Sequence, residues 1–407
     1  MRDDSVKQPL NGIRVADFSH VMAGPFASHL LRLMGAEVIK IEPKGGDQFR
    51  DYSPDAAFAG MSPPFIAANV GKKSIALNLK DSADIAIAHA IVERCDVMIE
   101  NFRPGVIARL GLSYEAVRET NPAVIFCSVS GYGQNSPQRD WPAIDNIVQA
   151  TTGMMLLSGG EGEPPVRVGF PIVDTLAGQT AALAILSAIV QRQATGEGAH
   201  IDVSMFDATL AFMTSAITPY LVTGKAMRRM GNTGYSGLPT ASLFTCKDGR
   251  QISLGIVQDN QFTAFARLVG HEHWLDDPKF ATPKARRANF DAMHDELART
   301  FRERDAAQWE AELSASGVPC GMIRTVKEAV DMASASGLLH LAIDGIPQIG
   351  TLAIPNAGFA MEPGGPGTDQ PPPRLDQHRA EILEWLQSEG ALAAAGATTK
   401  AEQDDDT

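Results

Sequence analysis

The segment from residue 13 to residue 43 constrains the fold most strongly, because it switches twice between two kinds of periodic structure. Residues 13–18 (IRVADF) form a short apolar run that is typical of a buried strand. Residues 23–35 (AGPFASHLLRLMG) carry a helical pattern that closes on Gly35 as a C-cap. Residues 37–43 (EVIKIEP) favour a second strand. A strand, a helix and a strand in this order predict a right-handed βαβ unit, from which parallel sheets are built.

The same alternation continues toward the middle of the chain. Further strands are predicted at 74–79, 96–102 and 124–131, with a helix at 82–95 and the longest helix from about Asp174 to Gln193. We therefore expect a doubly wound, Rossmann-like parallel sheet of the α/β class.

Length and composition predict two domains. A chain of 407 residues is longer than the roughly 250–300 residues at which one core stops growing. We predict a large Rossmann-like α/β domain over 1–220, completed by about 340–390, and a smaller α+β domain over 225–335. The terminal segment 391–407 has little to bury and is predicted to be disordered.

Charge and cysteine usage narrow the class of protein. A net charge of -13 argues against nucleic acid as a partner, because a polyanion would be repelled. The four cysteines are widely spaced, without a CxxC or Cys/His cluster, so we expect reduced thiols and no metal. The polar N-terminus resembles no signal peptide, and the apolar runs are too short for a bilayer. These features predict a cytoplasmic protein without a membrane partner.

Asp174 is the most informative single residue. The apolar segment 168–178 (VGFPIVDTLAG) leads into a helix start, which places its carboxylate at or near the N-cap. A capping role is the plain interpretation. The helix dipole would also hold the carboxylate ionised, and an ionised carboxylate in a pocket can attack a thioester. The residues alone leave both roles open.

Other candidate positions also have two interpretations. The first strand–helix junction, 17–25 (DFSHVMAGP), lies where such folds bind ligands but lacks the G-x-G-x-x-G dinucleotide motif. His20 in this junction could bind a ligand or shape the loop. The pairs Lys72-Lys73 and Arg228-Arg229, and Arg109, could contact phosphate or be solvated. The glycines at 231, 234 and 237 either close over a substrate or connect domains.

Taken together, the order and spacing of these segments resemble the class III CoA-transferase family. The likeness covers roughly residues 8–385, and it is strongest in five stretches: PLNGIRVADFSHVMAGPFASHLLRLMGAEVIKIEP, NVGKKSIALNLKD, VMIENFRPGVIARLGLSYE, NPAVIFCSVSGYGQ and PIVDTLAGQTAALAILSAIVQRQATGEGAHIDVSMFDA. The resemblance implies that Asp174 is the catalytic nucleophile. It would attack a donor acyl-CoA to form an anhydride, and the CoA thiolate would then form an aspartyl-CoA thioester. The acceptor carboxylate would attack that thioester and leave as the new acyl-CoA.

The resemblance also implies the binding residues and partners. Coenzyme A, bound as the acyl-CoA substrate and not as a permanent cofactor, would contact His20, Val21, Ala23, Lys44, Lys80, Asn101, Phe102 and Arg109. Met22, Ile144 and Asp145 would face the substrate, with Gly231, Gly234 and Gly237 in a lid. The implied assembly is a homodimer of two interlocked chains.

Departures from the family pattern bear on the substrate. Formyl-CoA transferases have a glutamine at Met22 and a tyrosine–glutamate pair at Ile144-Asp145, so oxalate and formate are disfavoured. We expect succinyl-CoA as donor and a dicarboxylic acid as acceptor, with Arg50 or Arg167 pairing its second carboxylate. Two alternatives are a 2-methylacyl-CoA racemase and a CoA-binding protein without catalysis. The racemase needs a histidine at residue 144, where this chain has isoleucine.

Overall fold

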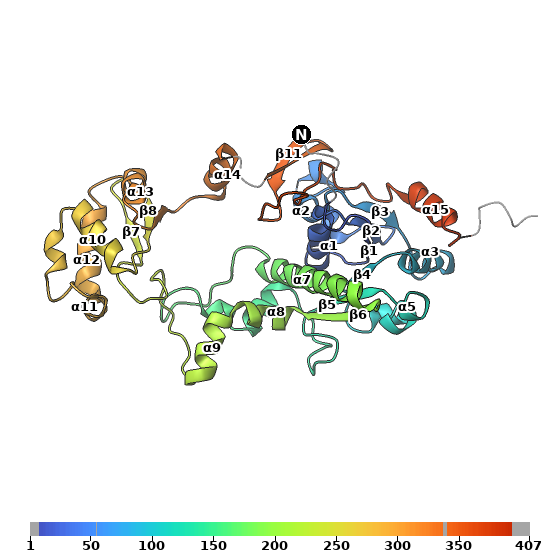
Figure 1. The fold of residues 1–407 in the computed structure, drawn as a ribbon, viewed down its shortest axis with the longest axis horizontal. Helices are drawn as coiled ribbons and strands as arrows, with labels where there is room; N and C mark the ends of the chain where they lie inside the picture. The colour runs from blue at the N-terminus through green and yellow to red at the C-terminus, as the bar shows by residue number, and fades with distance from the viewer. Residues whose placement is uncertain (1–7, 54, 337–339, 393–407) are drawn as a thin grey trace, which may run out of the picture. The chain divides into compact units, whose positions relative to one another are not determined.

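The computed structural model describes residues 8–53, 55–336 and 340–392, which form two units (Figure 1). The first takes the described residues of Met1–Thr152, Val168–Thr218 and Gly337–Thr407, and the second those of Gly153–Arg167 and Pro219–Ser336. Segment 153–167, which the predicted boundary at 220 assigns to the large domain, therefore packs with the second unit. The predicted disordered tail, apart from residues 391 and 392, lies outside the described residues.

The first unit is built on a six-stranded parallel sheet. Its strands are β1 (Arg14–Asp17), β2 (Glu37–Glu42), β3 (Lys73–Ala76), β4 (Val97–Glu100), β5 (Ile125–Ser130) and β6 (Ala199–Ser204). They lie in the order β3-β2-β1-β4-β5-β6, and every neighbouring pair is parallel. The prediction of a parallel α/β sheet is confirmed. The strand order reverses between β1 and β4, so the crevice beyond their carboxyl ends is where such sheets bind ligands.

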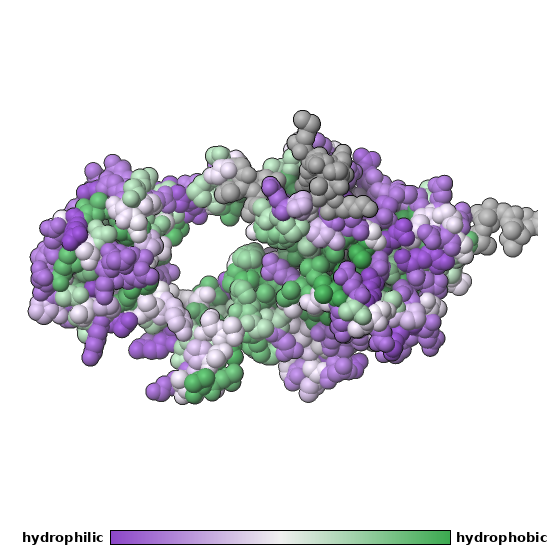
Figure 2. Space-filling model, viewed as in Figure 1, coloured by the Kyte–Doolittle hydropathy of each residue, from purple (hydrophilic) through white to green (hydrophobic). Residues whose placement is uncertain are grey.

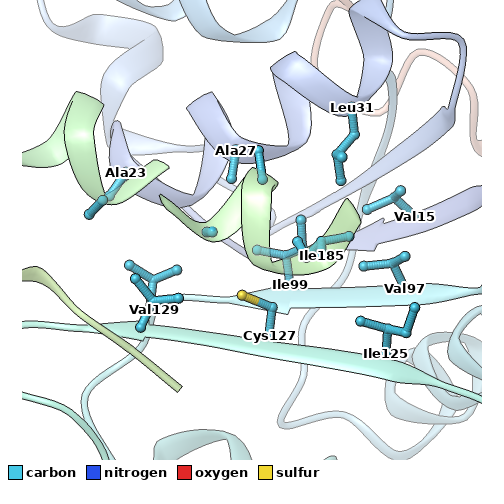
Figure 3. Close-up of a cluster of buried hydrophobic side chains, with 14 of the residues drawn as sticks. Val15, Ala23, Ala27, Leu31, Val97, Ile99, Ile125, Cys127, Val129 and Ile185 are labelled. Atoms are coloured by element: carbon cyan, nitrogen blue, oxygen red, sulfur yellow. The ribbon is translucent and has the colours of Figure 1, made fainter. Parts of the chain in front are cut away.

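The pleat of the strands sends alternate side chains into two cores. Ile125, Cys127 and Val129 of β5 face one core, whereas Phe126 between them faces the other. Figure 3 shows the first core, where Ala27 and Ile185 from two helices pack over these strands. A sheet covered on both faces explains why its strands read as continuous apolar runs.

Helices cover the two faces in different groups. The first core is closed by α1 (Ala23–Leu33), α6 (Asp145–Thr151) and α7 (Ile172–Thr195), and the second by α3 (Ser82–Glu93), α5 (Tyr114–Thr120) and α15 (Arg379–Ser388). By length and composition, α7 could cross a membrane. Its residues Ala177, Ala181 and Ile185 are instead fully buried against the sheet, as in the core helix of a globular domain.

Shorter elements complete the first unit. They are α2 (Pro63–Asn69), α4 (Val106–Arg109), α8 (Met205–Phe212), the hairpin strands β10 (His340–Ile346) and β11 (Gly350–Pro355), and 3-10 turns at Gln48–Asp51 and Ala56–Phe58. Helix α9 (Thr214–Thr223) leads from the first unit into the second. Leu341 and Ile343 of the hairpin pack against Phe65 of α2.

The second unit is a small α+β assembly. Its antiparallel sheet has the order β7-β8-β9, formed by β7 (Leu243–Thr245), β8 (Gln251–Leu254) and β9 (Cys320–Met322). Its helices are α10 (Asp259–Leu268), α11 (Pro283–Ala288), α12 (Phe290–Phe301), α13 (Ala306–Ala315) and α14 (Val326–Ala335), with 3-10 turns at Met154–Leu156 and Glu272–Leu275. Buried aromatic side chains, among them Phe265, Trp274 and Trp309, fill its core.

Candidate active site

Two loops meet at the point where the strand order reverses. The loop after β1 carries His20, and the loop after β4 carries Asn101. The His20 backbone N–H donates to Asn101 Oδ1 at 2.9 Å, and Asn101 Nδ2 donates to the His20 carbonyl at 2.8 Å. This reciprocal pair joins the two loops across the crevice.

Several predicted CoA-binding residues lie around this junction. The rings of His20 and Phe102 have centroids 5.4 Å apart, and the Phe102 N–H donates to Glu100 at 2.9 Å. Val21 has a φ of 67°, a left-handed conformation that costs a β-branched residue about 1–3 kcal/mol. Met22 follows as the N-cap of α1, and Ala23 is the first residue of that helix. The structure therefore brings His20, Val21, Ala23, Asn101 and Phe102 together.

The three predicted basic residues lie farther along the connections that follow β2, β3 and β4. Lys44 is exposed and forms an ion pair with Asp84 at 2.9 Å. Lys80 is exposed in the turn before α3, and Arg109 is exposed at the end of α4. Because the strands are parallel, these connections leave the same edge of the sheet.

Buried charges lie beneath the junction, and of these only Lys72 was a candidate from the sequence, as a phosphate contact or a solvated residue. Lys40 forms an ion pair with Asp47 at 2.9 Å, and Lys72 forms one with Asp17 at 3.1 Å. Burial alone would raise the pKa of Asp17, but Lys72 and Lys40 lower it to about 2. The available signal was that Asp17 and Lys40 interrupt apolar strands, where a charge requires a partner.

Two expectations for basic residues are corrected by this network. Lys72 is fully buried, so it is neither a solvated surface lysine nor free to contact phosphate. Its neighbour Lys73 pairs with Glu37 and Glu381. Arg50, considered as a partner for an acceptor carboxylate, is buried and donates to both oxygens of Glu42 at 2.6 and 2.7 Å.

Asp174 lies at a helix start, but it does not cap that helix. It is the third residue of α7, the N-cap is Pro171, and the Asp174 side chain makes no cap hydrogen bond. The cap comes from Asp145, whose Oδ2 accepts the N–H groups of Val173 at 2.7 Å and Asp174 at 3.3 Å. The capping role predicted for Asp174 is therefore wrong, because a carboxylate distant in sequence occupies those donors.

The protonation of Asp174 also differs from the expectation. Burial and, second, the negative charge of Asp145 raise the pKa of Asp174 from 3.8 to about 7. The expectation from the sequence was that the helix dipole would hold this carboxylate ionised. The N–H groups at the helix start donate to Asp145 and therefore do not stabilise the Asp174 carboxylate. Near pH 7 Asp174 is therefore present in both its protonated and its ionised form.

Asp145 itself is rigidly held. Its Oδ1 accepts Gln149 Nε2 at 2.6 Å, and Gln149 Oε1 accepts the Val168 N–H at 2.9 Å. Gln149 is fully buried, and the sequence analysis missed it. Ile144, one residue before Asp145, leaves 65% of its surface exposed, and half-buried Met22 precedes α1.

A close helix contact links Asp174 to the loop after β1. Gly178 lies one turn after Asp174 on α7, and a Cβ atom there would lie 2.6 Å from the Ala23 carbonyl oxygen. Only glycine therefore permits this approach of α7 to the first residue of α1. The contact places the helix that carries Asp174 against the helix that begins at the His20–Ala23 segment.

The predicted lid glycines belong to the second unit. The Gly231 N–H donates to the Gly159 carbonyl at 3.0 Å, and the Gly234 N–H donates to the Ala241 carbonyl at 2.6 Å. Gly237 has a φ of 65°, which glycine adopts without strain. In the same unit, Arg228 pairs with Glu161 at 2.9 Å on the surface, and Arg167 is exposed.

Comparison with known proteins shows one consistent set of relatives. Residues 10–379 match the model of CoA-transferase family III. The chain is 38% identical to the acetyl-CoA:oxalate CoA-transferase of Acetobacter aceti, over 92% of this chain and 95% of that protein. It is 34% identical to the succinyl-CoA:glutarate CoA-transferase of Mus musculus, over 96% and 89% of the two chains.

Solved structures show the same fold. A CaiB/BaiF family protein from Brucella suis superposes with a TM-score of 0.81 at 30% identity, over 94% of this chain and all of that one. A protein from Mycobacterium tuberculosis superposes with a TM-score of 0.81 at 26% identity, over 92% and 99% of the two chains.

Proposed function

The chain belongs to CoA-transferase family III, and from that premise we propose that it moves CoA from an acyl-CoA donor to a carboxylic acid through covalent intermediates on Asp174. The resemblance inferred from the sequence is confirmed, and with it the class of acyl-CoA:carboxylate CoA-transferase. The observation that supports the proposed mechanism is the start of α7, where Asp145 accepts the Asp174 N–H and Gly178, one turn later, packs against the Ala23 carbonyl.

The first half-reaction transfers CoA to the protein. The ionised Asp174 carboxylate attacks the donor thioester carbonyl, forms a mixed acyl-aspartyl anhydride and expels the CoA thiolate. The thiolate then attacks the aspartyl carbonyl of the anhydride. This step forms an aspartyl-CoA thioester and releases the donor as a free carboxylate.

The second half-reaction is the reverse sequence with another acid. The acceptor carboxylate attacks the aspartyl-CoA thioester, which gives a new anhydride and again a CoA thiolate. Attack of the thiolate on the acceptor's carbonyl forms the new acyl-CoA and regenerates the Asp174 carboxylate. Each step exchanges one activated carbonyl for another, so the four steps balance without an external oxidant or reductant. Water must be excluded because it would hydrolyse the anhydride.

The pKa of Asp174 suits this role. A carboxyl group with a pKa of about 7 is largely available as the carboxylate at slightly alkaline pH. The ionised form is also more basic than an ordinary aspartate, and nucleophiles of higher basicity react faster with acyl groups. Partial burial thus favours the nucleophile without requiring a separate general base.

For the substrates, we propose an acyl-CoA such as succinyl-CoA as donor and a dicarboxylic acid as acceptor. Two relatives that carry such substrates in their names, the succinyl-CoA:glutarate enzyme of Mus musculus and the succinyl-CoA–D-citramalate enzyme of Chloroflexus aurantiacus, are each 34% identical to this chain. The exposed Ile144 side chain presents an aliphatic surface beside Asp145, at the position where formyl-CoA transferases have a tyrosine. This difference supports an acceptor other than oxalate or formate.

CoA itself is proposed to bind along the carboxyl edge of the sheet. The His20, Val21 and Ala23 backbone and the Asn101–Phe102 loop would hold the part near the thioester. Lys44, Lys80 and Arg109, all exposed on connections from the same edge, would pair with its phosphates. Gly231, Gly234 and Gly237 are proposed to form a lid, as sequence analysis suggests.

We further propose a cytoplasmic, interlocked homodimer. All four cysteines are free thiols, in keeping with a reducing compartment. Leu183 and Val190 of α7 each leave 66% of their surface exposed, and Figure 2 shows hydrophobic surface over this part of the first unit. Apolar residues exposed on one helix favour burial against a second copy. Light scattering at micromolar concentration tests this, and a monomer would contradict it.

Trapping the intermediate tests the mechanism directly. The protein is incubated with succinyl-CoA, treated with hydroxylamine or borohydride, and digested for mass spectrometry. We expect a modified peptide at Asp174, and Asp174→Asn should abolish both the adduct and transfer while CoA still binds. Asp207, also the third residue of a helix, provides the matched control, and Asp207→Asn should remain active.

Other outcomes identify the alternatives. Near-normal turnover of Asp174→Asn would exclude the covalent mechanism. Exchange of the α-proton of a 2-methylacyl-CoA without transfer would indicate a racemase. Tight CoA binding by the wild-type protein with no adduct and no turnover would indicate a binding protein.

A further inference from the structure

The backbone N–H groups of Ser19, His20 and Val21 all donate to side-chain oxygens. The Ser19 N–H donates to Asp17 at 3.0 Å, and Lys40 Nζ donates to the Ser19 carbonyl at 2.8 Å. Asn101 serves both backbone groups of His20. The Val21 N–H donates to the two carboxylate oxygens of Asp47 at 3.1 and 3.2 Å.

Val21 explains why so many side chains converge here. A β-branched residue disfavours a positive φ, so the left-handed conformation of Val21 must be imposed by its surroundings. Without such contacts, Val21 would relax to an extended conformation, which rotates the next peptide and displaces Met22 and Ala23. Asp47 is the side chain that holds the Val21 N–H directly.

Asp47 is itself fixed on several sides. It caps a 3-10 turn by accepting the Phe49 N–H at 3.0 Å, and its own N–H donates to Glu42 at 3.1 Å. Its carboxylate pairs with Lys40 at 2.9 Å, and both side chains are almost completely buried. Lys40 therefore links the two ends of the segment, because it contacts Asp47 on one side and the Ser19 carbonyl on the other.

We propose that Asp47, supported by Lys40, is a positioning residue that sets the affinity for CoA by holding Val21 in its left-handed conformation. This inference rests on the proposed function, in which the His20–Ala23 segment binds CoA. Asp47 need not touch the substrate. It acts through the backbone of Val21, at the ligand-binding edge of the sheet.

A single substitution of Asp47 would not test this cleanly. It would leave Lys40 buried and unpaired, which is strongly destabilising, whereas removal of both charges together is often tolerated. The informative comparison is between two double variants, Lys40→Met/Asp47→Asn and Lys40→Met/Asp47→Leu. Both lack the ion pair and the Lys40 contact with Ser19. They differ in whether residue 47 can accept a hydrogen bond, because asparagine can serve the N–H groups of Val21 and Phe49 and leucine cannot.

The dissociation constant for CoA, measured by calorimetry, is the primary readout. We expect Lys40→Met/Asp47→Leu to bind CoA about tenfold more weakly or worse than Lys40→Met/Asp47→Asn, the effect of one buried hydrogen bond. In turnover assays the KM for acyl-CoA should rise, with a smaller change in the KM for the acceptor. The melting temperature of each double variant is measured first. CoA affinities are then compared at a temperature at which both variants are fully folded.

Val21→Gly supplies an independent test of the cause. Glycine adopts a positive φ without steric cost, so the segment then depends less on an acceptor at position 47. In the Val21→Gly background, the difference in CoA affinity between the two double variants should shrink to about threefold or less. An undiminished difference would show that Asp47 acts by another route and would overturn the proposal.

Asp96→Asn is the matched control for a lost ion pair. Asp96 pairs with Arg192 at 2.9 Å and accepts the Arg14 N–H at the opposite edge of the same sheet. It should lower stability without changing CoA affinity. Equal CoA binding by the two double variants would contradict this inference alone. Failure of the wild-type protein to bind CoA would contradict the proposed function, and this inference with it.

Discussion

The Asp145 carboxylate accepts the backbone N–H of Asp174 at 3.3 Å, so one acidic residue fixes the helix start that carries the other. A carboxylate in this position is favoured by the helix dipole. Its negative charge nevertheless lies close to the Asp174 carboxyl group and, after burial, is the second cause of the raised pKa there. Position and reactivity of Asp174 therefore depend on the same neighbour.

Asp145→Asn should move the pH dependence of the reaction. Asparagine can still accept the Val173 N–H, but it removes the charge that raises the pKa of Asp174. The ionised form would then persist to lower pH, so the acid limb of kcat/KM for acyl-CoA should shift down by about one pH unit. A pH series of initial rates measures this, with exposed Asp140→Asn as the control. An unshifted profile would mean that burial alone raises the pKa.

Asp174→Asn should change how stability depends on pH. The pKa of Asp174 is raised from 3.8 to about 7 in the folded protein, so the protonated form stabilises the fold. That contribution is complete below about pH 4 and is lost as the pH rises through 7, with an upper bound of about 4 kcal/mol. Urea titrations from pH 4 to pH 8 should show a smaller loss of stability for Asp174→Asn than for wild type. Parallel curves for the two proteins would contradict the raised pKa.

Gly178→Val should separate α7 from α1. A Cβ atom at this position would lie 2.6 Å from a backbone carbonyl oxygen of Ala23, which cannot rotate away. We expect a loss of about 1–3 kcal/mol in stability from overpacking and a larger proportional loss in turnover. Thermal unfolding and steady-state rates measure both effects. Gln179 is the next residue and is exposed, so Gln179→Ala should leave stability and turnover unchanged. A Gly178→Val variant that is as stable and active as the wild type would show that the close contact is not required.

Asn101→Ala should loosen the junction between the loops after β1 and β4. It removes both hydrogen bonds to the His20 backbone, each worth about 1 kcal/mol. We expect the KM for acyl-CoA to rise about thirtyfold, because two such bonds together correspond to about 2 kcal/mol. Asn101→Asp retains an acceptor for the His20 N–H but lacks the donor to the His20 carbonyl. Its KM should therefore lie between those of the wild type and Asn101→Ala. Equal KM values for all three proteins would show that the junction does not affect binding.

Much of the fold was predictable because its signals are local. The apolar runs at β1 and β2, with a helix closing at Gly35 between them, predict the βαβ unit from neighbouring residues alone. The absence of a dinucleotide motif in the first loop and the position of Asp174 at a helix start are likewise read from short segments. Family resemblance, and not periodicity, supplied the covalent chemistry proposed for Asp174.

The electrostatic details were not predictable in the same way. Lys72 looked like half of a surface pair, yet it is buried against Asp17, 55 positions earlier in the chain. Asp174 looked like a cap, yet the cap is Asp145, 29 positions earlier. Pattern shows that a charge lies in or near an apolar segment, but it does not show which partner the fold brings to it.

The sequence by itself thus determined the parallel α/β sheet, the edge at which such sheets bind ligands and, through the family resemblance, Asp174 as the candidate nucleophile. Hydrophobic periodicity and turn residues act over a few positions and can be read in one dimension. Tertiary structure decided the conformation of Val21, the cap on α7 and the pKa of Asp174. Each of these depends on Coulombic and hydrogen-bonding contacts between residues that become neighbours only when the sheet and helices have packed.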